Sequence, residues 1–136
     1  MNIRKIAVIF PTSALALVTL FAPLLSGAQL TDRDKQFLSA YDKVHQALVA
    51  DDLAGAKTGA ANLGPSGSEL AKSKSLEEAR AAFVRPSEEA AKLAAGQPGY
   101  YVMHCPMKNK DWVQISDKVA NPYGGPGMTS CGEIKK

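Results

Sequence analysis

Two short segments near the C-terminus carry the side chains with the clearest metal-binding chemistry in this chain. Cys105 is separated from Met107 by one residue, and Met128 is separated from Cys131 by two. Thiolates and thioethers are soft ligands, and they select soft metal ions such as Cu(I). If the two segments meet in the fold, the four sulfurs can converge on one ion. The spacing therefore predicts a candidate copper site.

The residues around Cys105 add to this pattern. His104 supplies an imidazole as an auxiliary donor, and Pro106 stiffens the turn that carries the first pair of sulfurs. Zinc held by His104, Cys105 and Cys131 is an alternative, although the ligand spacing typical of zinc sites is absent.

A structural disulfide between Cys105 and Cys131 is the second interpretation of the same residues. Such a bond is favoured in an oxidising compartment. It would close a loop of about 25 residues and stabilise the protein by about 3 kcal/mol. In that case Met107 and Met128 would serve as core fillers, and the loop with Asn121, Pro122 and Tyr123, together with Trp112, would be a candidate contact surface.

Several enzyme and cofactor motifs are absent from the sequence. It contains no Cys-x-x-Cys-His for covalent haem, no His-Glu-x-x-His, no phosphate-binding Walker loop and no Gly-x-Ser-x-Gly. A thiol enzyme would need a base that reaches the thiol and a third group that orients this base. No such third group can be identified beside His104 and Cys105, and we expect no enzymatic activity and no covalent cofactor.

The N-terminus predicts export. Basic residues at positions 4 and 5 precede an uncharged stretch over residues 6–25, and small residues follow at Ser26 and Ala28. This order is typical of a secretory signal peptide that is cleaved after Ala28. We therefore expect a periplasmic or secreted protein with no stable membrane anchor. An uncleaved anchor is the alternative, since the stretch is long enough to span a bilayer.

The remaining chain, residues 29–136, has the size of one small domain. The formal net charge falls from +3 for the whole chain to +1, because the leader holds two basic residues and no acidic one. Nucleic-acid binding needs a concentrated basic face, and none is predicted here. In a domain this small the apolar core is limited, so a cross-link or metal in the C-terminal part would add stability.

Residues 29–96 are rich in Ala, Leu, Glu and Lys and favour helices. An apolar stripe follows a cap at Thr31, and we expect its His45 to be a core histidine. Further helices are expected over residues 52–63, from a cap at Ser75, and from a cap at Ser87 after Pro86 to a stop at Gly96.

Residues 97–136 hold both cysteines, the only tryptophan and most of the prolines outside the leader. Residues 100–107 and 112–115 have strand propensity, and residues 121–127 form a turn-rich loop. Trp112, Tyr100, Tyr101 and Tyr123 are most simply core residues. The predicted fold is mainly α: a small antiparallel bundle of three or four helices, followed by a loop-rich segment with short β-strands.

Residues of both parts resemble the domain of unknown function three-three-four-seven. The C-terminal pattern comprises Cys105-Pro106-Met107, Trp112, Asn121-Pro122-Tyr123, Gly125, Met128 and Cys131-Gly132. Arg80, Phe83 and Ser87 fit an Arg-x-x-Phe-x-x-x-Ser pattern in the last helix of that family. Departures from the family include Gly124 in place of an aromatic residue and Val113-Gln114 after the tryptophan.

The resemblance implies a context of periplasmic metal homeostasis. Members of that family are exported bacterial proteins, and some are fused to the adaptor subunits of heavy-metal efflux pumps. We therefore expect a metal-binding module, most simply for copper, with an efflux adaptor or a copper carrier as its partner. A disulfide-stapled structural or protein-interaction domain without metal remains the alternative.

Overall fold

The structure is a computed structural model that describes residues 28–135. This part of the chain contains five α-helices, one 3-10 helix and three strands. The helices are α1 (Asp32–Val49), α2 (Leu53–Ala60), η1 (Ala61–Gly67), α3 (Ser68–Lys72), α4 (Leu76–Ala82) and α5 (Val84–Ala94), and the strands are β1 (Tyr101–Cys105), β2 (Lys110–Gln114) and β3 (Glu133–Ile134). The predicted fold class, mainly helical with short C-terminal strands, is confirmed.

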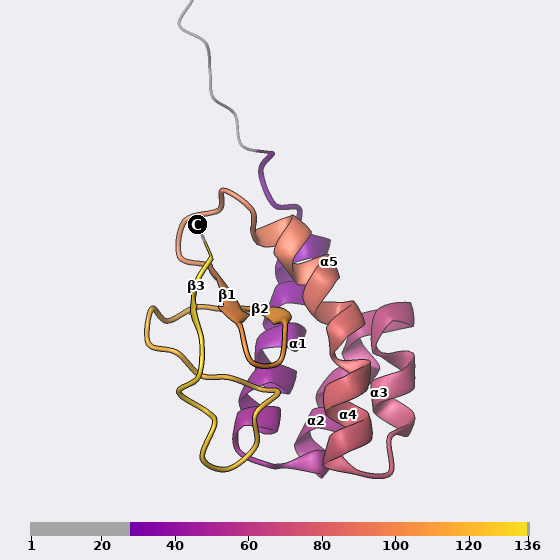
Figure 1. The fold of residues 1–136 in the computed structure, drawn as a ribbon. Helices are drawn as coiled ribbons and strands as arrows, with labels where there is room; N and C mark the ends of the chain where they lie inside the picture. The colour runs from indigo at the N-terminus through magenta and orange to yellow at the C-terminus, as the bar shows by residue number, and fades with distance from the viewer. Residues whose placement is uncertain (1–27, 136) are drawn as a thin grey trace, which may run out of the picture.

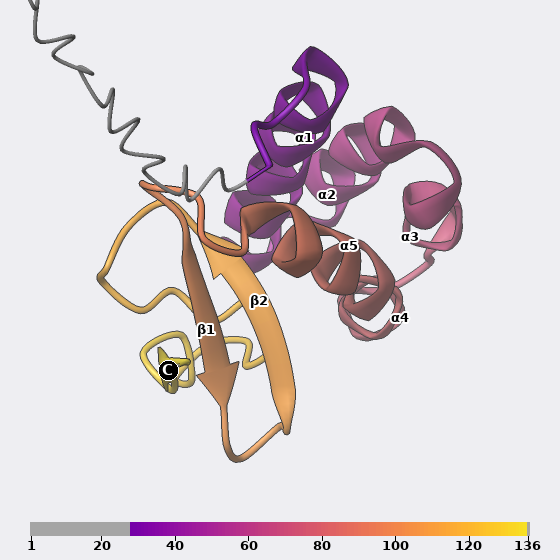
Figure 2. The same cartoon turned by 90° about the horizontal axis from the view of Figure 1, so that it is seen from above.

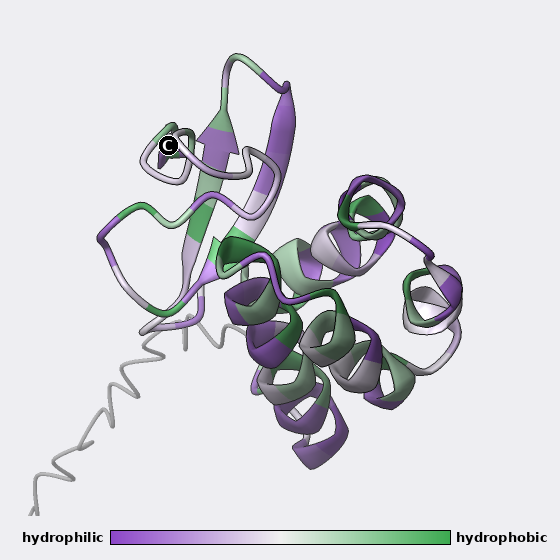
Figure 3. Cartoon of the chain, turned by 90° about the horizontal axis from the view of Figure 1, so that it is seen from below, coloured by the Kyte–Doolittle hydropathy of each residue, from purple (hydrophilic) through white to green (hydrophobic). Residues whose placement is uncertain are grey.

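The helices come first along the chain, and the strands and the C-terminal loop lie to one side of them (Figure 1). The strands form one antiparallel sheet in the order β2-β1-β3. In Figure 2 this sheet lies between the helices and the loop that connects β2 to β3. In Figure 3 the helices alternate between hydrophilic and hydrophobic segments, as amphipathic helices do.

The predicted caps at Thr31 and Ser75 and the predicted stop at Gly96 are confirmed. The Thr31 side chain accepts a hydrogen bond from the Asp34 amide, and the Asp34 carboxylate accepts one from the Thr31 amide at 2.9 Å, which completes a capping box. The Ser75 hydroxyl accepts from the Glu78 amide at the start of α4. Gly96 follows α5 with φ +72°, a conformation that glycine adopts without strain.

Two predicted helix boundaries are wrong. The segment 52–63 does not continue as one α-helix, because α2 ends at Ala60 and the chain tightens into η1, where Gly64 has a non-helical conformation and Pro65 follows. Ser87 does not cap α5, because this helix already begins at Val84. Pro86 fits within its first turn, where an amide has no helical partner to lose.

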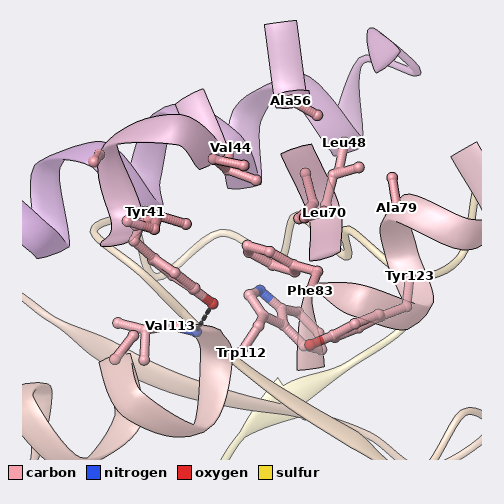
Figure 4. Close-up of a cluster of buried hydrophobic side chains, with 14 of the residues drawn as sticks. Tyr41, Val44, Leu48, Ala56, Leu70, Ala79, Phe83, Trp112, Val113 and Tyr123 are labelled. Carbon is pink, nitrogen blue, oxygen red and sulfur yellow. Dashed lines mark hydrogen bonds between the residues drawn. The ribbon is translucent and has the colours of Figure 1, made fainter. Parts of the chain in front are cut away.

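A buried aromatic cluster joins the helices to the C-terminal segment (Figure 4). The Phe83 ring stacks on the Tyr41 ring with their centroids 4.9 Å apart, and Tyr123 packs on the other side of it at 5.9 Å. The Trp112 ring meets Tyr123 edge to face at 6.3 Å. Through these contacts, side chains of the helical half and of the C-terminal half belong to one hydrophobic core.

The predicted leader, residues 1–28, lies outside the described residues except for Ala28. Within residues 28–135, no helix combines the length and the apolar composition that a membrane crossing requires.

Candidate functional site

The structure brings the two cysteines together. Cys105 is the last residue of β1, and Cys131 lies in the loop two residues before β3, which pairs with β1. The two Sγ atoms are 3.4 Å apart, and no bond joins them. Cys105 is fully buried, whereas Cys131 is partly exposed. One thiol of the pair therefore faces the protein interior, and the other is accessible from solvent.

Hydrogen bonds around Cys105 favour its thiolate. Burial by itself raises the pKa of a thiol, but hydrogen bonds from the backbone of Lys108, from the side chains of Cys131 and Asn121, and from the backbone of Met107 outweigh it. The pKa of Cys105 is therefore held below its ordinary value. Clustered backbone amides in a tight turn stabilise anions in this way.

Cys131 behaves in the opposite sense. Its hydrogen bond to Cys105, its partial desolvation and the negative charge that develops on Cys105 all raise the pKa of the Cys131 thiol. The two thiols therefore ionise as a pair, in which Cys105 loses its proton first and Cys131 keeps its proton between the two sulfurs.

Asn121 fixes the position of the loop that carries Cys131. Its side-chain amide donates to the Cys131 carbonyl at 2.7 Å, and its side-chain carbonyl accepts from the Tyr123 amide at 2.8 Å. Its own backbone amide donates to the Thr129 carbonyl at 2.7 Å. The side chain is completely buried, so this residue orients the thiol pair from within the protein.

The contact surface expected at Trp112, Asn121, Pro122 and Tyr123 is wrong for these side chains. Trp112 and Asn121 are 0% exposed, Tyr123 is 5% exposed, and Pro122 is also buried. They form the interior of the C-terminal segment because a small domain needs its large aromatic groups in the core. The core assignment of Trp112 and Tyr123 is confirmed, whereas Tyr100 and Tyr101 are half-buried.

The two methionines occupy different environments. Met107 follows Cys105 by two residues in the β1–β2 turn, and its side chain is 76% exposed. Because its backbone donates hydrogen bonds to both thiols, Met107 starts beside the pair and extends into solvent. Met128 is half-buried, and its backbone carbonyl accepts from the Cys131 amide at 3.0 Å.

His104 faces away from the thiols. It precedes Cys105 in β1, and successive residues of a strand point to opposite faces of the sheet. Its register partner across the hairpin is Asp111, whose Oδ1 lies 2.6 Å from His104 Nδ1. Sequence reasoning missed Asp111 as a functional residue. The alternation of the two strands is the signal that would have paired it with His104.

Arg80 ties the loop of the site to the helices. Its Nε donates to the Pro122 carbonyl at 3.0 Å, and its Nη2 donates to the Leu48 carbonyl at 3.1 Å and pairs with the Asp51 carboxylate. Phe83 and Ser87, which share its sequence pattern, also contact the C-terminal segment. These contacts of the three-residue pattern position the loop against the helices.

The number of donors limits which ions this site can hold. Within residues 28–135, no group of three or more Cys, His, Asp and Glu side chains is placed to hold a metal ion. The thiol pair thus offers two strong ligands, and the Met107 side chain begins beside them. Two soft sulfurs suit a soft monovalent ion better than zinc, which is held by four ligands in structural sites.

Comparison of the chain with known protein families, with curated proteins and with solved structures finds no match. The functional assignment therefore depends on the geometry of the thiol pair and on the sequence pattern around it.

Proposed function

We propose that this protein is a small metal-binding module that carries one Cu(I) ion as cargo between Cys105 and Cys131. The observation that carries this proposal is the 3.4 Å separation of the two Sγ atoms, one of them buried and the other partly exposed. A buried sulfur retains the ion, and an exposed sulfur allows exchange with another carrier. No bond-making reaction is required for such a role.

The separation of the thiols suits a shared ion after a small movement. Thiolates bind zinc at about 2.3 Å, and a similar distance to Cu(I) would separate two opposed sulfurs by at most about 4.6 Å. The pair would therefore open by about 1 Å, which a loop residue such as Cys131 can accommodate. Soft thiolates and thioethers select Cu(I) among the common ions.

The charges of the site favour a monovalent cation. Cys105 is the thiol that ionises first, and the ion would replace the proton that Cys131 shares with it. The amide hydrogen bonds that stabilise the Cys105 thiolate would remain in place around the bound ion. Binding would therefore release protons, and the affinity would increase with pH.

Met107 and Met128 are the proposed thioether ligands. The exposed Met107 side chain begins beside the pair, so a change of its rotamers can bring its sulfur over the ion or toward an incoming carrier. His104 would act only as an auxiliary donor after rearrangement, because it lies on the other face of β1. We further propose a periplasmic or secreted location, with an efflux adaptor or a copper carrier as partner.

The test is a Cu(I) titration of the purified protein without oxygen, in competition with a chromogenic Cu(I) chelator. We expect one ion per chain, and we expect Cys105→Ser or Cys131→Ser to abolish competition with the chelator. Met107→Leu combined with Met128→Leu should weaken the affinity by about tenfold, whereas Met103→Leu in the core should not change it. Unchanged affinity in the double methionine variant would refute the thioether ligands, and unchanged affinity in both cysteine variants would refute the site.

The same separation supports a second candidate function, a structural or protein-interaction domain held by a Cys105–Cys131 disulfide. A disulfide needs an S–S distance of about 2.05 Å, so the sulfurs would approach by about 1.4 Å. Mass spectrometry of the protein isolated without reductant separates the two functions. A mass two hydrogens lower than the reduced chain, with no copper bound after Cu(I) addition, would favour the disulfide.

A further inference from the structure

A hollow of about 670 Å³ lies between α5 and the β1–β2 hairpin, away from the thiol pair. Its helical wall is apolar where Val84, Ala91 and Ala95 line it. Its other wall contains His104 and Asp111, which face each other across the two strands. A concave site with an apolar wall and a few fixed polar groups is the usual form of a small-molecule site.

The polar groups of this wall are held in place. Asp111 accepts from His104 through one carboxylate oxygen and from the Lys135 ammonium through the other. Partial burial raises the pKa of Asp111, but these two hydrogen bonds and the nearby positive charges outweigh it and lower the pKa. With Asp111 ionised, the Nδ1 atom of His104 carries the proton of this hydrogen bond.

The charges around the hollow attract an anion. Lys92, Lys110 and Lys135 line it, opposed by the carboxylates of Glu88 and Asp111. Lys135 is engaged by Asp111, whereas neither Lys92 nor Lys110 has a carboxylate within 4.0 Å among residues 28–135. The Lys110 ammonium lies 5.8 Å from the centroid of the Tyr123 ring, a contact that leaves its charge available.

We propose that this hollow binds a small organic carboxylate with a short aliphatic body. The carboxylate would lie between Lys92 and Lys110, and the aliphatic part would lie against Val84, Ala91 and Ala95. An inorganic anion would leave the apolar wall uncovered, and a neutral apolar molecule would leave both ammonium groups without a counter-charge. The site is independent of the thiol pair, because His104 and Cys105 face opposite sides of β1.

The test uses two-dimensional amide NMR of the full chain with hexanoate as the probe, compared with hexanol and with acetate. Hexanoate should produce saturable shifts at the amides of α5 and of the hairpin, with a dissociation constant at least fivefold lower than that of either comparison compound. The shifts should persist in the Cys105→Ser, Cys131→Ser variant, which lacks the proposed metal ligands.

Charge variants complete the test. Lys92→Gln with Lys110→Gln should weaken hexanoate binding at least fivefold, whereas the matched control Lys43→Gln with Lys74→Gln, at two exposed lysines outside the hollow, should not. Equal binding of acetate would indicate a general anion effect, and equal binding of hexanol would indicate an apolar site. Either result, or the absence of saturable shifts, would overturn the proposal.

Discussion

The hydroxyl oxygen of Ser87 on α5 lies 2.9 Å from the hydroxyl oxygen of Tyr123 in the C-terminal loop. The Tyr41 hydroxyl of α1 is also 2.9 Å from the Ser87 hydroxyl. The Tyr41 hydroxyl accepts from the Val113 amide at 3.1 Å (Figure 4). Tyr123 additionally lies 3.1 Å from the Asp111 carbonyl, which can only accept. Because each hydroxyl can donate only one hydrogen bond, one arrangement pairs all of these groups. The Val113 amide donates to the Tyr41 hydroxyl, and the Tyr41 hydroxyl donates to the Ser87 hydroxyl. The Ser87 hydroxyl then donates to the Tyr123 hydroxyl, which donates to the Asp111 carbonyl.

Replacing the central member of this chain of hydrogen bonds should destabilise the protein. In Ser87→Ala both tyrosine hydroxyls lose a buried partner, and an unpaired buried polar group costs about 1–3 kcal/mol. We therefore expect the free energy of unfolding in urea to fall by about that amount. Ser39→Ala is the matched control, an exposed serine of a helix, and it should be neutral or slightly stabilising. Equal effects of the two changes would contradict the structural role of Ser87.

The helical half was largely predictable because its signals are local. The caps at Thr31 and Ser75 and the apolar stripe of α1 follow from residues three or four positions apart, and the structure has all three. Ser87 was misassigned because a serine after a proline has the local pattern of a cap. Its hydroxyl instead bonds Tyr41 and Tyr123, 46 and 36 residues away, and no local pattern contains that information.

The thiol site was predictable only in part, for the same reason. The soft ligand types pointed to Cys105 and Cys131, and these two residues do meet. The partner of a loop side chain and the register of two strands are both decided by tertiary packing. The sequence therefore did not reveal that Asn121 orients the Cys131 loop. It also did not reveal that Asp111, through the hairpin register, pairs with His104. The alternation of β1 could have shown that His104 and Cys105 face opposite ways.

His45 should make the stability depend on pH. Burial lowers its pKa, while its Nε2 atom donates to the Ala120 carbonyl at 2.7 Å. Among residues 28–135 the buried Nδ1 atom has no hydrogen-bond partner, and it lies 4.0 Å from the Asp42 carboxylate. The native state therefore binds the proton less readily than the unfolded chain, whose histidine has a pKa of about 6.5. His45 therefore contributes to the stability of the folded protein at a pH above about 6.5, and this contribution is lost as the pH falls below that value.

This dependence can be measured by urea unfolding between pH 5 and pH 7.5. The free energy of unfolding should decline toward acid by at most about 1.4 kcal/mol per pH unit, the limit for one proton. His45→Gln, which keeps an amide donor for the Ala120 carbonyl, should flatten this part of the profile. If His104→Gln flattens it and His45→Gln does not, the assignment to His45 is wrong, since these are the two histidines of the chain.

Gly132 allows the Cys131 loop to pass close to Trp112. A Cβ atom at this position would lie 2.5 Å from Cη2 of the fully buried Trp112 ring and 3.2 Å from the His104 carbonyl oxygen. Gly132→Ala should therefore displace the ring or the loop and destabilise the protein by about 1–3 kcal/mol. The emission of Trp112, the only tryptophan, should shift to the red as its environment becomes more polar.

The matched control for this change is Gly127→Ala. Gly132 has a φ of +156°, and Gly127 likewise has a positive φ, of +83°. Apart from its two chain neighbours, no described residue has an atom within 4 Å of a Cβ built at Gly127. The variant should lose stability through backbone strain alone and leave the tryptophan emission unchanged. An unshifted spectrum in Gly132→Ala would show that the close contact with Trp112 does not constrain the loop.

The thiol pair should titrate in two separated steps. Ultraviolet absorbance of thiolates in the metal-free, reduced protein should increase first below the pH expected of an ordinary thiol, when Cys105 ionises. The second increase in absorbance should come above the pH expected of an ordinary thiol, because the Cys105 thiolate raises the pKa of Cys131.

Two variants test this interaction between the thiols. In Cys105→Ser the negative charge of the Cys105 thiolate is absent, so the thiol of Cys131 should titrate at a lower pH than the second step of the unaltered protein. In Asn121→Ala the first step should move to higher pH, since the Cys105 thiolate loses a hydrogen-bond donor. A single unresolved step in the unaltered protein, with no change in either variant, would mean that the sulfurs do not interact, and it would remove the basis for a shared ion.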